Sequence, residues 1–319
     1  MPPFLYKYLP PECLGTVFGN AGFASFKCST PAEFSDPYEL FLSVDLDTDS
    51  ELLAFHRDVV GELPQLPTTC FSRSPIVVPM WCHHAGNFRG AVIELDQARL
   101  AECFPHSRLE DVTYADRASD DLMNLLVRAR ELQKPRYSVM LGAAVLHAAY
   151  FTKLAVWQYE RECRLVLRES ETTKRDGHVL VDVPLSCVPA ILLGSRIPST
   201  SAQLLETAAA ECGCDVFRLT IGRASSVPYF ADSDGHSWVF DDSALVSAPY
   251  YCDSCRAPTP GTEAECAWCR LTESDLRDAA NRNPLRLFAE LGLLERYLTQ
   301  LGTPGGPGGP NVVEPFPPS

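Results

Sequence analysis

Four cysteines near the C-terminus have the residue type and the spacing to bind a metal ion. The stretch "CDSCRAPTPGTEAECAWC" contains two C-x-x-C pairs, Cys252 with Cys255 and Cys266 with Cys269. Two such pairs joined by a short loop let four thiolates surround one tetrahedral zinc ion. Two disulfides are the alternative, and a reducing compartment disfavours them. Because sulfur would fill all four positions and leave none for a substrate water, we expect this Zn2+ to be structural.

A second group of reactive side chains lies in "WQYERECRLVL", from Trp157 to Leu167. Alternate side chains of a strand point to opposite faces, so an extended run places Glu160, Glu162 and Arg164 together on one face. A surface ion pair on an exposed sheet is the ordinary explanation of such a pattern. The aromatic residues that flank these charges favour a binding site instead.

Three further segments carry candidate binding residues. Lys7 lies between two tyrosines in "LYKY", and Ser72 ends the apolar run "TTCFS". Trp81 and His83 lie in "MWCHH", a segment whose neighbours predict an irregular loop, where binding residues are common. Ser72 lacks the G-x-S-x-G sequence of a hydrolase nucleophile, and the chain contains no P-loop, Rossmann fingerprint or H-E-x-x-H motif. The common nucleotide-binding and protease classes are therefore unsupported.

The elements that must position these groups alternate between strands and helices. Hydrophobic patterning predicts a mixed α+β fold with a mainly antiparallel sheet, a helical insertion, and then a small zinc ribbon with a helix. We expect domains at residues 1–247 (α+β), 248–301 (ribbon and helix) and 302–319 (Gly/Pro-rich disordered tail). The predicted strands are residues 4–9, 22–29, 66–72, 89–96, 162–169, 178–185, 188–194, 215–221 and 237–242. The predicted helices are 49–60, two within 120–157 that separate near Pro135, 199–212 and 285–301. Residues 73–88 are too rich in Pro, Gly and aromatics to predict a regular element.

Composition and charge exclude several classes of protein. The 319 residues are 46% hydrophobic, which supports a sizeable core, and the net charge is −14. A negative surface repels phosphate backbones, so we expect no general nucleic-acid binding. No run approaches the ~18 apolar residues of a membrane span, and the N-terminus lacks the pattern of a signal peptide, so we expect a cytoplasmic protein without membrane contact. The chain has 13 cysteines, and most of those outside the four of the ribbon are interpreted as reduced, buried thiols.

Five sequence blocks appear in an order that resembles the bacterial domain-of-unknown-function family 2971. They are "LYKY", "STPAEFSDPYE", "CFS", "MWCHHAGNFRGAVIELD" and "KLAVWQYERECRLV", and they cover about the first 200 residues. The chain departs from the family pattern at Ser35, where Asn is usual, and at His84, where Tyr is usual. The resemblance implies a fold rather than an activity.

The same segments resemble, more weakly, the toxin-type ADP-ribosyltransferases. That resemblance implies that Lys7 and Tyr6 hold NAD on the first strand, where the toxin pattern has His or Arg instead of Lys7. It implies that the "CFS" and "WCHH" segments lie at the nicotinamide and that Glu162 or Glu160 is the catalytic carboxylate. Arg164 would hold this carboxylate or meet a phosphate. The candidate site residues are Glu162, Glu160 and Lys7 as catalytic groups, and Tyr6, Ser72, Trp81, His83 and Arg164 as NAD-binding groups.

The expected function is therefore transfer of ADP-ribose from NAD to a macromolecular acceptor, or NAD cleavage, in bacterial defence or conflict. The alternative is a non-catalytic interaction or sensor protein that binds a nucleotide, or a protein partner at the zinc ribbon. A third hypothesis, removal of phosphate from RNA with NAD as acceptor, requires a basic face that the overall charge does not favour. Clustering of Lys7, His83 and Glu162 in one cleft would favour the enzyme hypotheses, and dispersal would favour the binding module.

Overall fold

The computed structural model describes residues 3–34, 36, 43–223 and 225–301. The chain divides into two compact units, which are treated separately. Unit 1 comprises the chain up to Tyr251 together with Arg256–Thr262, and unit 2 comprises Cys252–Cys255 and the chain from Glu263 onward. The predicted tail 302–319, and Ser35 and residues 37–39 of the second family block, lie outside the described residues.

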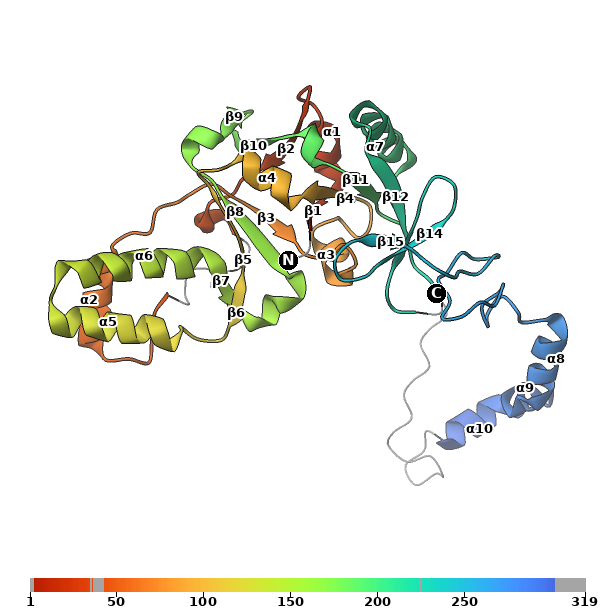
Figure 1. The fold of residues 1–319 in the computed structure, drawn as a ribbon. Coiled ribbons are helices and arrows are strands. Elements are labelled where there is room, and N and C mark those ends of the chain that lie inside the picture. The colour runs from red at the N-terminus through yellow and green to blue at the C-terminus, as the bar shows by residue number, and fades with distance from the viewer. Residues whose placement is uncertain (1–2, 35, 37–42, 224, 302–319) are drawn as a thin grey trace. The chain divides into compact units, whose positions relative to one another are not determined.

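Unit 1 is built on a large, mostly antiparallel sheet (Figure 1). Its ten described strands, in spatial order, are β15 (Leu245–Ser247), β14 (Ser237–Phe240), β13 (Tyr229–Ala231), β12 (Asp215–Thr220), β11 (Ala190–Leu193), β4 (Ala91–Asp96), β1 (Phe4–Leu9), β3 (Thr68–Ser72), β8 (Glu162–Val166) and β5 (Arg108–Asp111). Within this sheet, the parallel pairing described is that of β11 with β12. The predicted mixed α+β class is confirmed.

Two smaller sheets complete the described strands. One contains β2 (Phe23–Lys27), β10 (His178–Pro184) and β9 (Thr173–Arg175), and the other pairs β6 (Thr113–Ala115) with β7 (Thr152–Leu154). The first of these packs its alternate residues Phe26 and Val181 against one face of the large sheet. It therefore acts as a cover for the core rather than as an extension of the large sheet.

The large sheet is packed on both faces because its central strands are apolar at odd and even positions alike. Leu5, Ile93 and Leu165 face a core that is covered by α1 (Leu14–Val17), α4 (Gln97–Cys103) and α7 (Ser199–Cys212). Tyr8 and Val92 face a second core, which is covered by α3 (Val78–His83). Polar side chains buried among these layers must therefore find partners within the protein.

A helical insertion lies beside the sheet within unit 1 (Figure 1). It contains α2 (Ser50–Val60), α5 (Asp120–Leu132) and α6 (Pro135–Phe151), which pack around Leu126, Leu141 and Val145. The Ser119 side chain accepts a hydrogen bond from the Leu122 N–H and starts α5, and Pro135 starts α6 at a position where no N–H is needed. The predicted separation of two helices near Pro135 is confirmed.

Three sequence predictions are wrong. Residues 73–88 contain α3, which begins with a proline at its second position, where a missing N–H costs nothing. The run from Trp157 to Leu167, considered above as extended throughout, begins in a 3-10 helix at Ala155–Glu160, and β8 starts only at Glu162. The single helix predicted for 285–301 is divided into α9 (Pro284–Glu290) and α10 (Leu294–Leu301) by Gly292, which has φ = +67°, and it is preceded by α8 (Glu273–Arg282).

Among the described residues, no helix combines the length and the hydropathy that crossing a membrane requires.

Candidate functional site

A cavity lies where strands β1 and β3 separate. Strand β1 pairs with β4 at six positions but with β3 only at Tyr6 and Ser72. The Lys7 side chain reaches toward β3, and its Nζ donates hydrogen bonds of 2.9 Å to Thr69 Oγ1 and to the Cys70 carbonyl oxygen. The cavity has a volume of about 570 Å³, within the range of small-molecule sites. Its charged and titratable lining includes Lys7, Lys27, Glu33, Asp36, His83, His84, Lys153, Glu160, Glu162 and Arg164.

Glu162 and Arg164 form a buried ion pair in the cavity wall. They are two residues apart on β8, so both side chains lie on the same face of the sheet, as the sequence predicted. Glu162 is 5% exposed and Arg164 1% exposed. Burial alone would raise the pKa of Glu162, but the charge and hydrogen bonds of Arg164, with the charge of Lys153, outweigh it and lower this pKa to about 2. The Glu162 carboxylate is therefore fixed in its ionised form.

Glu160 pairs with Lys153, as Glu162 does, but it lies outside the strand that carries Glu162. It ends the 3-10 helix, and Arg161 follows with φ = +48° before β8 begins. This left-handed residue turns the chain so that Glu160 Oε2 and Glu162 Oε2 both accept hydrogen bonds from Lys153 Nζ, at 2.6 and 3.1 Å. The predicted shared face of Glu160 and Glu162 is thus present, but it does not come from continuous strand alternation.

Ser72 holds the Glu160 backbone rather than presenting a free hydroxyl. Its Oγ donates to the Glu160 carbonyl oxygen at 2.7 Å and accepts from the Ser74 N–H at 3.1 Å. Ser72 is 0% exposed, although it belongs to the lining of the cavity. Its hydroxyl therefore positions the 3-10 helix against β3.

Lys7 lacks a described negative partner. The two hydrogen bonds that its Nζ donates go to uncharged oxygen atoms, and no carboxylate forms an ion pair with it among the residues that the structure describes. Burial lowers the pKa of Lys7, because it disfavours the charged form. A bound anion would supply the missing negative charge.

The remaining predicted residues are divided between the cavity and the core. His83 lines the cavity and is exposed. Trp81 does not line the cavity: it is 0% exposed, and its Nε1 donates to the Pro75 carbonyl oxygen at 2.7 Å. Tyr6 belongs to the lining but is also 0% exposed, and its ring packs edge-on against Phe240 at 5.8 Å. Trp81 and Tyr6 thus contribute packing to the wall behind the cavity.

Lys153, Trp157 and His84 complete the site, although the sequence did not single them out as site residues. Lys153 Nζ lies 5.1 Å from the centre of the Trp157 ring, and His84 Nε2 lies 3.6 Å from Glu160 Oε1. The one available signal was their place in the two quoted blocks around Trp81 and Glu162. Pairing between separate segments cannot be read from either block alone.

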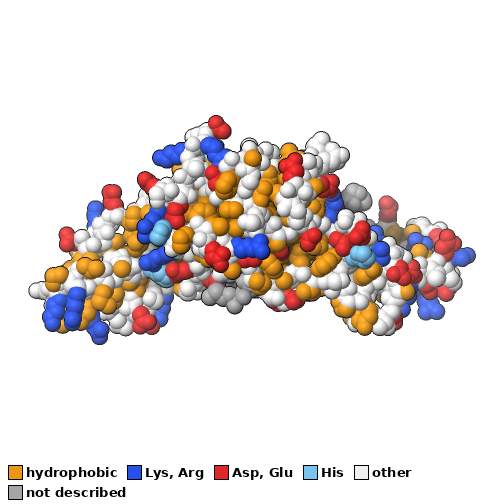
Figure 2. All heavy atoms as spheres, turned by 45° about the horizontal axis from the view of Figure 1, so that its top comes forward, with side chains coloured by type: hydrophobic (Ala, Val, Ile, Leu, Met, Phe, Trp, Pro, Cys, Tyr) orange, Lys and Arg blue, Asp and Glu red, His pale blue; other side chains and the backbone are white. Residues whose placement is uncertain are grey.

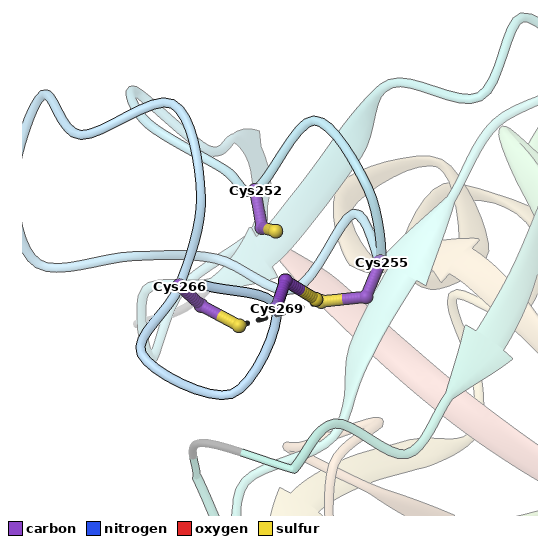
Figure 3. Close-up of side chains that lie close together, drawn as sticks. All are labelled: Cys252, Cys255, Cys266 and Cys269. Atoms are coloured by element: carbon purple, nitrogen blue, oxygen red, sulfur yellow. Dashed lines mark hydrogen bonds between the residues drawn. The ribbon is translucent and has the colours of Figure 1, made fainter. Parts of the chain in front are cut away.

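The four predicted zinc ligands come together in unit 2. Their sulfur atoms all lie within 4.8 Å of one another, and Figure 3 shows the four side chains converging from the two C-x-x-C turns. Hydrogen bonds from backbone N–H groups lower the pKa of Cys252 and of Cys266, whereas side-chain hydrogen bonds with Cys255 and Cys266 raise the pKa of Cys269. The cluster is compatible with a structural zinc ion, and the four residues would hold it as a closed site.

Charges of both signs are mixed on the surface. On the face shown in Figure 2, acidic and basic side chains are scattered among hydrophobic ones, without a continuous basic patch among the residues drawn in colour.

Comparisons of the chain with protein-family models, with curated proteins and with solved structures find no match in any of the three. The two resemblances drawn from the sequence accordingly remain predictions. A function must be argued from the geometry of the cavity and of the cysteine cluster.

Proposed function

We propose that the cavity binds NAD and that the protein transfers ADP-ribose from NAD to a macromolecule or cleaves NAD. The observation that carries this proposal is the clustering of Lys7, His83, Glu160 and Glu162 around one cavity, although they come from segments about 150 residues apart in the chain. From the sequence, clustering of Lys7, His83 and Glu162 in one cleft is the arrangement that favours an enzyme.

The carboxylates support the chemistry of this reaction. Breaking the bond between nicotinamide and ribose leaves positive charge on the ribose, and a nearby carboxylate stabilises that charge. Glu162 is ionised because Arg164 and Lys153 lower its pKa. Glu160 adds a second carboxylate on the same lysine.

The cations of the cavity support a ligand that carries phosphate. Lys7 has only uncharged hydrogen-bond acceptors among the described residues, and Lys27 lines the same cavity. A pyrophosphate at this position would pair with Lys7 and remove the cost of an uncompensated buried charge. A cavity lined by both carboxylates and lysines suits a molecule that has a reactive ribose and an anionic pyrophosphate.

The test is release of nicotinamide by the zinc-loaded protein, followed by chromatography. We expect turnover in the wild type and a loss of roughly 100-fold or more in Glu160→Gln and in Glu162→Gln. Glu211→Gln is the matched control, because Glu211 is exposed at the end of α7. Absence of nicotinamide release from the wild type with every acceptor class offered would reject the enzyme proposal.

A second candidate function is ligand binding without turnover. It is favoured by the Glu162 carboxylate, because both of its oxygens already accept hydrogen bonds from Arg164. A carboxylate neutralised in this way stabilises a developing positive charge less well. In this case calorimetry would detect NAD binding to the wild type while nicotinamide release stays at the level of the protein-free control.

A further inference from the structure

His84 contacts the carboxylate of Glu160 but forms no ion pair with that of Glu162 among the described residues. His84 follows α3 directly, and its backbone N–H donates to the Met80 carbonyl oxygen at 2.8 Å. Its imidazole lines the cavity, and its Nε2 lies 3.6 Å from Glu160 Oε1. The His84 side chain is 44% exposed, whereas that of Glu160 is 6% exposed. A solvent-accessible imidazole therefore stands against a buried carboxylate.

Two hydrogen bonds hold Glu160 in place and leave its Oε1 directed toward His84. Its Oε2 accepts from Lys153 Nζ at 2.6 Å, and its carbonyl oxygen accepts from Ser72 Oγ at 2.7 Å. In Glu162, by contrast, Arg164 donates to both carboxylate oxygens. The two glutamates therefore differ in their hydrogen bonds. Both carboxylate oxygens of Glu162 accept from Arg164, whereas Oε1 of Glu160 faces the imidazole of His84.

We propose, building on the proposed NAD reaction, that His84 is the catalytic base of this site and that Glu160 supports it. In the tautomer with hydrogen on Nε2, the N–H faces Glu160 and Nδ1 is the basic nitrogen. The oxygen of an attacking hydroxyl group, from water or from an acceptor, forms a bond to ribose C1′. The bond from C1′ to the nicotinamide nitrogen breaks, and its electron pair returns to the ring.

The proton of the attacking hydroxyl moves to His84 Nδ1, so that atoms and charge balance. The Glu160 carboxylate then stabilises the imidazolium across the 3.6 Å contact, as the carboxylate of a catalytic triad does. Glu162 does not touch the attacking group in this scheme. It keeps the role toward the ribose charge proposed above, and through its contacts with Arg164 and Lys153 it also sets the place of Glu160.

His83 provides a comparison within the same cavity. It is the adjacent residue, has the same side chain and also lines the cavity. Among the residues that the structure describes, no carboxylate forms an ion pair with it. A ligand-binding role for His83 affects KM, whereas a base at His84 affects kcat.

The experiment is steady-state nicotinamide release by the zinc-loaded wild type, His84→Ala and His83→Ala, with and without added imidazole. We expect His84→Ala to lower kcat by roughly 100-fold or more with little change in KM, and imidazole to restore part of the rate. His83→Ala is expected to raise KM chiefly.

Two results would overturn the assignment while the proposed function stands. One is a His84→Ala kcat within twofold of a measurable wild-type kcat, and the other is a lowered kcat that imidazole does not raise. Absence of turnover in the wild type would overturn the proposed function and this assignment together.

Discussion

The guanidinium of Arg164 donates two hydrogen bonds to the carboxylate of Glu162, from Nε to Oε1 at 2.8 Å and from Nη2 to Oε2 at 3.1 Å. Both side chains are almost fully buried. A buried pair of this kind contributes little when intact, because desolvation offsets attraction, but removal of one partner leaves an uncompensated charge. The pair thus makes the wall of the cavity sensitive to pH and to substitution.

Acid should weaken the fold through Glu162. Its pKa is about 2 in the folded protein against an ordinary value of 4.5, so its contribution is present above pH 4.5 and is lost as pH falls toward 2. We expect the free energy of unfolding to lose about 3 kcal/mol more in the wild type than in Glu162→Gln across this interval. Urea unfolding at several pH values measures it, and parallel pH curves for the two proteins would contradict the ion-pair account.

The pH dependence of stability that comes from Glu94 should be opposite to that from Glu162. Glu94 lies across from Tyr6 in the pairing of β1 with β4, and burial, with the nearby charge of Asp215, raises its pKa to about 7. Stability from this neutral carboxyl is present below pH 4.5 and is lost as pH rises toward 7. We therefore expect Glu94→Gln to gain about 3 kcal/mol relative to wild type between pH 4 and pH 8. A constant difference between the two unfolding free energies across this range would show that the pKa of Glu94 is the same in the folded and unfolded protein.

Ser72→Ala tests whether this hydroxyl holds the backbone or binds a ligand. The substitution leaves the Glu160 carbonyl oxygen and the Ser74 N–H without their present partner. We expect a loss of about 1–3 kcal/mol in the free energy of unfolding, measured by urea titration, and a lower kcat because Glu160 is less well placed. A stability equal to that of the wild type, together with a raised KM alone, would assign Ser72 to the ligand instead.

Lys7→Met tests the anion position. A charge-assisted hydrogen bond contributes about 1.5–3 kcal/mol, so loss of the ammonium should weaken NAD binding by roughly 10-fold or more in calorimetry. Lys174→Met, on the exposed strand β9, is the matched control. If nicotinamide riboside, which lacks the pyrophosphate, loses affinity to the same extent as NAD, then Lys7 does not contact the anion.

Zinc removal should unfold unit 2 selectively. The helices α8, α9 and α10 contain no buried residue, so little apolar burial supports them without the metal. We expect chelation, or Cys252→Ser, to raise hydrogen exchange across residues 263–301 while the strands of unit 1 stay protected. Cys212→Ser is the control, and one bound zinc per chain is expected by metal analysis. Hydrogen exchange that stays unchanged across residues 263–301 after complete metal removal would show that zinc does not stabilise the fold of unit 2.

Local signals explain how much could be predicted from the sequence. The cysteine spacing predicted the four-sulfur cluster, and apolar periodicity predicted α2, α5, α6 and α7 with β1, β3 and β4. These features depend on neighbours within a few residues along the chain. Patterning also predicted the shared face of Glu162 and Arg164, because both lie within one regular strand.

The arrangement of the site depends on contacts that no local pattern contains. Lys153 joins Glu160 to Glu162 only because Arg161 adopts a left-handed conformation, which is uncommon for a residue with a long side chain. His84 meets Glu160 from a separate segment. Trp81, which was predicted to bind NAD, is instead buried in the core that α3 covers.

The separation of β1 from β3 is a property of the backbone, since the two strands share one paired position however their side chains vary. The space between them is therefore independent of the groups that line it. Exchange of Lys7 or His83 for other residues would change which molecule is preferred while the order of strands stays the same. The order of the strands thus sets where the opening lies, and the side chains of the lining set which molecule it accepts.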